Sequence, residues 1–172
     1  MRAILAFFSA LAFVGPVLAQ QPSDSPTVTV GPWSIATTYK ADMFENCIMT
    51  RSTPDLGVAF IRNKDGLILG LDSSDWKLER GKAYSVRLSA GAQSIDTMAL
   101  AETKSVTIAL ADKPFNKKLR TANALAVHGE GAVLHVPLDG SAAALDRLDQ
   151  CFEKNMREGA AVNPFVAPAR RP

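Results

Sequence analysis

The chain is poor in the residues that usually mark an active site. It has two cysteines and two histidines among 172 residues, and aromatic side chains make up 7% of the total. It contains no CxxC pair, no Gly-x-Ser-x-Gly turn and no glycine-rich phosphate-binding loop. The sequence therefore predicts no catalytic residue, no metal site and no cofactor.

A block of charge of one sign is also absent. Lysine and arginine number 19 against 17 acidic residues, which gives a net charge of +2. A protein that binds the phosphate backbone needs a strongly basic surface. We therefore expect no nucleic acid partner.

Long apolar runs are missing after the start of the chain. Residues 3–14 are predominantly apolar, which falls short of the roughly 20 residues that span a bilayer. Arg2 precedes this run, and small residues end at Ala19, just before Gln20. This order is typical of a secretory signal peptide cleaved between Ala19 and Gln20. We expect a periplasmic or secreted protein with no transmembrane segment after cleavage.

The remaining chain is long enough for one domain with its own core. We assign residues 1–19 to the signal peptide and residues 20–26, rich in Pro, Ser and Gln, to a flexible leader. A single β-rich domain is expected over 27–158. Residues 159–172 carry prolines and alanines without a periodic apolar face and are predicted to be a disordered tail.

Short alternating segments dominate the domain, and turn residues separate them at roughly 8–12-residue intervals. Asn63 to Gly66 forms a clear hairpin turn signal. Such spacing is typical of an antiparallel β-sandwich or barrel-like domain, here with a short helix and a C-terminal helix. The predicted strands are 27–30, 33–39, 47–51, 58–62, 67–71, 84–88, 94–101 and 106–110.

A further hairpin is predicted within residues 123–138. Gly129 and Glu130 suit a two-residue type II′ turn, which would pair His128 with Gly131. In that register Leu125 and the other apolar residues of both strands share one face. That set is Leu125, Val127, Leu134, Val136 and Leu138.

Two helices complete the prediction. Residues 114–121 suit a short helix, since Pro114 stands at its tolerated first turn. A second helix begins near Ser141, which we expect to act as N-cap and accept backbone N–H bonds. Its apolar stripe is Leu145, Leu148, Phe152 and Met156, and the residues expected to face water are Asp146, Arg147, Asp149 and Glu153.

Cys47 and Cys151 are the only cysteines. Export places them in an oxidising compartment, which favours a structural disulfide between an early strand and the last helix. Two free thiols or a metal site are the alternatives, and the absence of nearby histidines in sequence disfavours the metal.

Other candidate chemistry is weak. Ser74 and Lys77 match Ser-x-x-Lys, but the companion motifs of that chemistry are missing. In the predicted hairpin register His128 and His135 lie about 13 Å apart, too far to share an ion. Trp33 and Trp76 are either core residues or anchors for a partner, because aromatic side chains serve both roles.

The chain distantly resembles the invasion-associated locus B type periplasmic proteins of alphaproteobacteria. The resemblance rests on Gly31-Pro32-Trp33-Ser34-Ile35, on a second strand with a cysteine, and on the Val-Pro-Leu-Asp-Gly-Ser-Ala-Ala-Ala-Leu pattern that ends at Leu145. The cysteine usual after the early tryptophan is missing over 36–38. The resemblance implies an exported β-sandwich-like protein with an envelope or host-interaction role and no catalytic residues.

The leading hypothesis is therefore a non-catalytic binding or envelope-associated protein whose partner is a protein or an envelope component. One alternative is a hydrolase whose site is assembled from distant residues. Another is an inhibitor of an envelope or host hydrolase.

Export can be tested directly on the protein made in its own host. We expect the N-terminal sequence of the periplasmic or secreted form to begin at Gln20, because signal peptidase cleaves after small residues. Edman sequencing or mass spectrometry of that fraction checks this. Ala19→Arg should block cleavage, and an unprocessed wild-type chain in the cytosol would contradict the prediction.

Overall fold

The computed structural model describes residues 27–41 and 43–161. The predicted signal peptide, its cleavage site and the whole leader over 20–26 lie outside these residues. The elements are β1 (Val28–Val30), β2 (Trp33–Lys40), β3 (Met43–Ser52), β4 (Gly57–Asn63), β5 (Gly66–Asp72), β6 (Ala83–Ala90), β7 (Gln93–Ala101), β8 (Ser105–Leu110), α1 (Lys113–Leu119), β9 (Ala124–His128), β10 (Val133–Pro137) and α2 (Ser141–Ala161).

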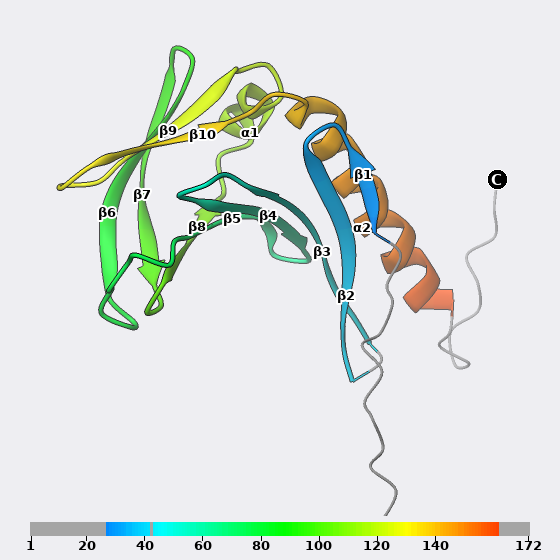
Figure 1. Ribbon diagram of the computed structural model, residues 1–172. Coiled ribbons are helices and arrows are strands. Elements are labelled where there is room, and N and C mark those ends of the chain that lie inside the picture. Colours follow the sequence, from blue (N-terminus) through cyan, green and yellow to red (C-terminus); the bar gives the residue numbers. More distant parts are fainter. Residues whose placement is uncertain (1–26, 42, 162–172) are drawn as a thin grey trace, which may run out of the picture.

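The strands form one antiparallel sheet in the order β1-β2-β3-β4-β5-β8-β7-β6-β9-β10. The sheet curls strongly, and its ends, β1 and β10, do not pair with each other (Figure 1). The mainly antiparallel β fold with one short and one C-terminal helix is confirmed. It takes the form of a single open, curled sheet.

The concave face of the sheet holds the core. Successive strand residues point to opposite faces, and most of those on this side are apolar and buried, although Thr37, Arg51 and Arg62 also lie on it. Helix α2 packs on β2, β3 and β4, whereas α1 packs on β6, β7 and β8. The largest fully buried side chains include Trp33, Met49, Phe60, Leu69, Leu88, Ile108, Phe115 and Leu148.

Trp33 connects the first strands to the start of α2. Its side chain is fully buried and meets the Phe60 ring edge-on, with 5.8 Å between centroids. Its indole N–H donates to the Asp139 carbonyl at 2.9 Å. The turn that follows needs glycine at position 140, because φ is +71° and an added Cβ would lie 3.1 Å from Pro32 Cδ.

The β4–β5 hairpin follows the prediction. Asn63 pairs with Gly66, and the Asn63 side-chain oxygen accepts from the backbone N–H groups of Asp65 and Gly66 at 2.9 and 3.0 Å. The Asn63 side chain therefore stabilises the predicted turn by accepting hydrogen bonds from its backbone N–H groups.

The register predicted for the last hairpin is wrong by two residues. His128 pairs with Val133, and a four-residue loop over 129–132 is closed by a bond from Gly129 N–H to the Ala132 carbonyl at 2.9 Å. A shift of two leaves each side chain on its predicted face, because strand side chains alternate with period 2. Leu125, Val127, Val136 and Leu138 are accordingly buried, and Leu134 is partly buried.

The predicted N-cap role of Ser141 is also wrong. Ser141 is the first residue of α2, and its buried hydroxyl donates to the Leu119 carbonyl at 2.9 Å. Leu119 ends α1. The serine therefore satisfies a carbonyl left free at the end of α1, and this hydrogen bond connects the end of α1 to the beginning of α2.

Helix α2 keeps most of its predicted faces. Leu145 and Leu148 are buried, but Met156 is 46% exposed. Asp149 was expected to face water, but it is half-buried and pairs with both Arg62 and Arg120. The helix ends at Ala161, so it enters the segment predicted to be a tail, and residues 162–172 lie outside the described residues.

The predicted disulfide joins Cys47 of β3 to Cys151 of α2, across 104 residues of sequence. Cys47 is fully buried and Cys151 partly so. The bond fastens the helix to the inner face of the sheet near the middle of α2.

We expect the double variant Cys47→Ala/Cys151→Ala to lose about 2–5 kcal/mol of unfolding free energy, because a loop of this length constrains the unfolded chain strongly. Urea denaturation measures the loss. Reduced wild-type protein is the control and should behave like the variant. Two free thiols in unfolded, unreduced wild-type protein would contradict the assignment.

Asp139 lies in the turn before α2 and carries an ion pair with Arg51 of β3. Arg51 donates to its carboxylate, and this hydrogen bond holds the pKa of Asp139 below its ordinary value. The ionised side chain therefore favours the fold above the ordinary carboxyl pKa, and this contribution is lost as pH falls through the lower folded pKa. We expect Arg51→Gln to raise the Asp139 pKa in an NMR titration.

The matched control is Arg87→Gln. Hydrogen bonding from Arg87 lowers the pKa of Asp96 in the same way, on β6 and β7. This variant should move the Asp96 titration and leave Asp139 unchanged. An Asp139 pKa that does not respond to Arg51→Gln would contradict the prediction.

Candidate functional site

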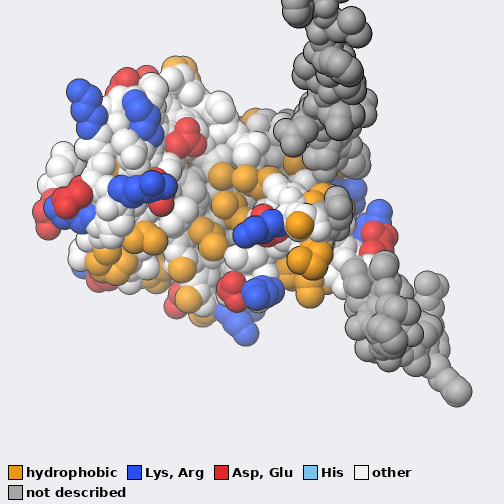
Figure 2. Space-filling model, turned by 90° about the horizontal axis from the view of Figure 1, so that it is seen from below, with side chains coloured by type: hydrophobic (Ala, Val, Ile, Leu, Met, Phe, Trp, Pro, Cys, Tyr) orange, Lys and Arg blue, Asp and Glu red, His pale blue; other side chains and the backbone are white. Residues whose placement is uncertain are grey.

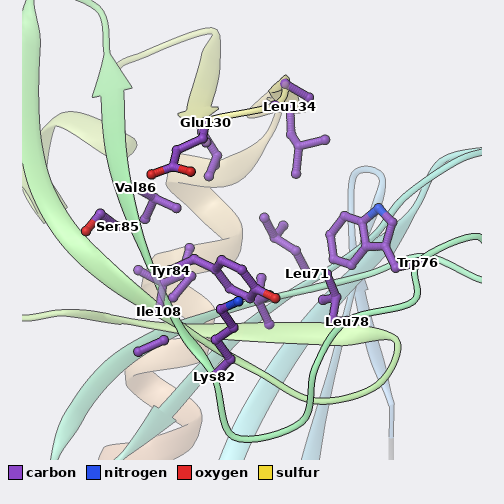
Figure 3. Close-up of a pocket in the computed structure, with 17 residues that line it drawn as sticks. Leu71, Trp76, Leu78, Lys82, Tyr84, Ser85, Val86, Ile108, Glu130 and Leu134 are labelled. Carbon is purple, nitrogen blue, oxygen red and sulfur yellow. The ribbon is translucent and has the colours of Figure 1, made fainter.

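A pocket of about 600 Å³ opens on the concave face of the sheet (Figure 3). Its walls come from β5, β6, β7, β8, β9 and β10, from segment 73–82 and from the loop 129–132. No residue of α1 or α2 lines it, so it occupies the part of the concave face that the helices leave open. The apolar residues of the lining are Leu71, Trp76, Leu78, Ala83, Tyr84, Val86, Ala99, Val106, Ile108, Val127, Ala132 and Leu134.

The pocket has a closed floor and open walls. Leu71 and Ile108 are fully buried, and Ala99 is 2% exposed, so the floor is continuous with the core. Trp76, Val86 and Leu134 are only partly buried, and they pack against the same core. Apolar side chains around the opening therefore keep contact with solvent.

Strand pairing explains the hollow. Tyr84 of β6 pairs with Ala99 of β7, which pairs with Ile108 of β8. These three side chains form one row on the concave face, and the small one stands between two larger ones. A methyl group at the middle position leaves space that a leucine or phenylalanine would fill.

Segment 73–82 is held in place by its backbone. Leu78 N–H donates to the Thr103 carbonyl at 3.0 Å, and Gly81 N–H donates to the Ala101 carbonyl at 2.8 Å. Trp76 N–H closes a turn on the Ser73 carbonyl at 3.3 Å. These bonds set Trp76 and Leu78 beside the pocket, on the side facing Leu134 (Figure 3).

The polar side chains that line the pocket are few. Lys82 and Glu130 lie on opposite sides of it (Figure 3). The Lys82 ammonium is 5.4 Å from the centre of the Tyr84 ring and 3.4 Å from Glu79. Ser85 borders the pocket through its backbone, because its side chain lies on the opposite face of the sheet from Tyr84, where the hydroxyl contacts the Met98 sulfur at 3.6 Å. This hydroxyl therefore has no base within hydrogen-bond reach, which a nucleophile needs.

The Ser74 and Lys77 pair does not have the geometry of its motif. Both residues are exposed and lie in segment 73–82, which is not helical, so Lys77 does not stand one helical turn from Ser74. The Ser74 hydroxyl donates to the Asp75 carboxylate at 3.2 Å. A hydroxyl engaged with a neighbouring aspartate on the surface indicates a solvated turn.

The histidines are closer together than predicted. His135 pairs with Ala126, two strand residues from His128, because the hairpin register is shifted. The expected separation of about 13 Å is therefore wrong and halves to roughly 7 Å. Both side chains are exposed, and within 27–41 and 43–161 no group of three His, Cys, Asp or Glu is placed to hold a metal ion.

The two tryptophans have separate positions. Trp33 is buried in the core, where a partner cannot reach it, whereas Trp76 lines the pocket. Sequence reasoning missed the other lining residues, among them Lys82, Tyr84 and Glu130. The alternation of residues 84–88 identified a half-buried strand, but it does not distinguish a covered side chain from one beside a cavity.

The convex face carries a second apolar feature. Ile48, Ile61 and Ile68 are register neighbours on β3, β4 and β5, and each is half-buried. Seen from below the sheet of Figure 1, hydrophobic side chains gather in the middle of the molecule (Figure 2).

Comparison with solved structures shows a likeness in fold. The solved structure of invasion-associated protein B from Bartonella henselae resembles this chain with a TM-score of 0.57 and 22% sequence identity. The match covers 76% of this chain and 99% of that one. No protein-family model matches, and no curated protein matches in sequence. The distant resemblance inferred from the sequence is thus confirmed in the fold.

Neither helix in the described part of the chain has the length and apolar character needed to cross a membrane.

Proposed function

We propose that this chain is an exported, non-catalytic binding protein of the cell envelope and that the concave pocket is its ligand site. The observation that carries the proposal is the pocket lining, in which apolar side chains from six strands surround a volume with few polar groups. Pockets of roughly 300–1,000 Å³ with mainly apolar walls are typical of small-molecule sites.

The chemistry of the lining supports binding over catalysis. Hydrolysis requires a nucleophile, a base within hydrogen-bond reach and donors for the developing oxyanion. The Ser85 hydroxyl lies on the opposite face of the sheet, where it contacts the Met98 sulfur, and Lys82 and Glu130 lie on opposite sides of the pocket. Lys82 and Glu130 suit the orientation of a bound molecule better than the cleavage of one.

Three features support a place in the envelope. The signal-peptide pattern at the start of the chain favours export, and a disulfide is stable in an oxidising compartment. The fold resembles a protein described as invasion-associated. By extension from that description, the proposal includes a role for this chain in contact with a host.

The test is to isolate the protein from its own host under native conditions and to identify what it carries. We expect native mass spectrometry to find one small molecule bound to the wild-type chain, because an apolar pocket of this size retains an apolar ligand through hydrophobic burial. Val86→Glu should lose it, since a carboxylate at the wall has no partner there.

A variant with alanine at Ser74, Lys77, His128 and His135 is the control for catalysis. It should carry the same molecule in the same amount as the wild type. A compound that accumulates in this variant but not in the wild type would show that the wild type consumes it. That result, or wild-type protein with an empty pocket, would contradict the proposed function.

A further inference from the structure

We infer that the ligand is a single-chain amphiphile, whose acyl chain fills the pocket and whose anionic head group lies against Lys82. This inference rests on the proposed function and specifies its ligand. The head group is a carboxylate or a phosphate, as in a fatty acid or a single-chain phospholipid.

The lining favours a flexible alkyl chain. The floor offers aliphatic contacts from Leu71, Ala99 and Ile108, and the walls offer more from Val86 and Leu134. These side chains present no unpaired buried donor or acceptor that a polar ligand would need to satisfy. Each methylene that leaves water adds to the binding free energy, so a chain of several methylenes would bind through this surface alone.

A folded protein partner fits this surface poorly. A stable protein interface needs about 800 Å² on each side, spread over a broad surface. The pocket is instead a hollow bounded by segment 73–82 and the loop 129–132. A ligand that enters it must be narrow.

Lys82 gives the pocket its polarity. Its ammonium lies over the Tyr84 ring, which is itself part of the lining, at 5.4 Å from the ring centre. Its present ion-pair partner is Glu79, with side chains 52% and 75% exposed, and exposed pairs of this kind are weak. An anionic head group can therefore replace Glu79 at the ammonium.

Glu130 determines which way round the amphiphile lies in the pocket. It lies on the side of the pocket opposite Lys82 (Figure 3), so it repels an anion there and leaves the Lys82 side as the favourable one. A cationic amphiphile would meet the reverse arrangement, with Lys82 repelling its head group. Binding should therefore discriminate by the charge of the head group at constant chain length.

The test uses the full mature chain, with its native ligand removed, and four 12-carbon probes below their micelle concentrations. These are dodecanoate, dodecyl phosphate, dodecanol and dodecylammonium. We expect saturable 1:1 binding in calorimetry, with the anions at least fivefold tighter than dodecanol and dodecylammonium the weakest. The better of the two anions distinguishes a carboxylate head group from a phosphate.

Lys82→Gln should weaken the anions three- to tenfold and leave dodecanol unchanged. Lys77→Gln, an exposed lysine of the same segment outside the lining, is its control and should change nothing. Trp76 supplies a second readout, because the other tryptophan is buried in the core. Trp76→Phe should remove the fluorescence change on binding while calorimetry still detects the ligand.

Val86→Glu should abolish binding of all four probes. Leu100→Glu is the matched control, since Leu100 is 51% exposed on the opposite face of the same sheet and should retain wild-type affinity. If Val86→Glu fails to fold by circular dichroism, Ala132→Trp takes its place. It puts an indole on the exposed loop that borders the pocket and should weaken binding at least tenfold.

Three results would overturn the inference: no saturable binding of any probe, equal affinity for dodecanoate and dodecylammonium, or a folded pocket variant that binds like the wild type. The proposed function is tested separately, by native mass spectrometry of the protein isolated from its own host. If the molecule carried by the native protein is lost in Val86→Glu but is no single-chain amphiphile, the binding function stands and the amphiphile assignment falls.

Discussion

The contact between α2 and the inner face of β2, β3 and β4 is the interaction on which the rest of the structure depends. An open sheet that is apolar on one face is stable only when that face is covered. Leu145 and Leu148 lie against the strands, and the disulfide from Cys151 to Cys47 holds the next turn of the helix there. The same helix leaves the far part of the concave face uncovered, which is where the pocket lies.

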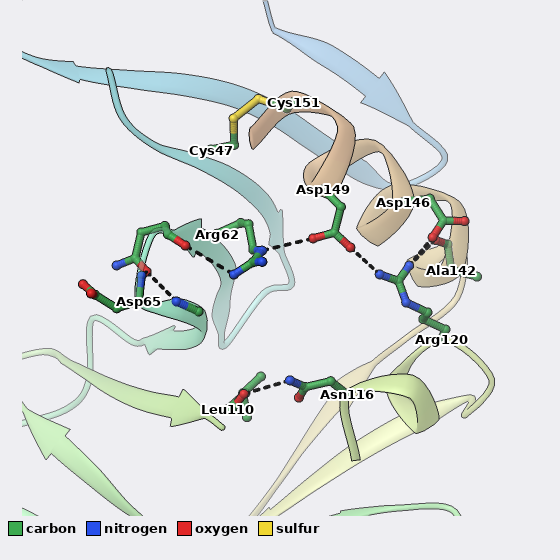
Figure 4. A network of polar contacts seen from close by, with 12 residues as sticks. Cys47, Arg62, Asp65, Leu110, Asn116, Arg120, Ala142, Asp146, Asp149 and Cys151 are labelled. Atoms are coloured by element: carbon green, nitrogen blue, oxygen red, sulfur yellow. Dashed lines mark hydrogen bonds and ion pairs between the residues drawn. A yellow bond between two sulfur atoms is a disulfide. The ribbon is translucent and has the colours of Figure 1, made fainter. Parts of the chain in front are cut away.

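A chain of ion pairs joins the separate elements around this contact (Figure 4). Asp149 of α2 accepts from Arg62 of β4 at 3.2 Å and from Arg120, just after α1, at 2.6 Å. Arg120 also pairs with Asp146. These groups are partly exposed, so each pair contributes little to the free energy of unfolding. Their joint geometry nevertheless fixes how α1 sits relative to α2, since Arg120 holds two carboxylates one helical turn apart.

Alternation of apolar and polar residues, together with turn signals, predicted a segment within each of the ten strands, although β3 begins at Met43, four residues before the predicted start. Strand order could not be predicted. The contacts of β5 with β8 and of β6 with β9 join segments that are distant in sequence, and no local turn signal specifies them. The last hairpin shows the same division, since its faces were correct whereas its register depended on a bond between Gly129 and Ala132.

The candidate site was less predictable than the fold for a physical reason. Tyr84, Val86 and Leu88 occupy equivalent positions in the pattern of β6, yet Leu88 is fully buried while Tyr84 and Val86 line the pocket. What separates them is the cover supplied by other elements, and a sequence pattern carries no information on where that cover ends.

The same reasoning explains why stability and binding share one face without conflict. The floor of the pocket is core, so Leu71 and Ile108 keep their packing whether or not the pocket is filled. Part of the wall comes from segment 73–82 and the loop 129–132, which are connections and contribute less to the core, and Val86 and Leu134 supply the rest. Selection can therefore alter Trp76, Lys82 or Glu130 to change a ligand while the disulfide and the contact of α2 with the sheet preserve the fold.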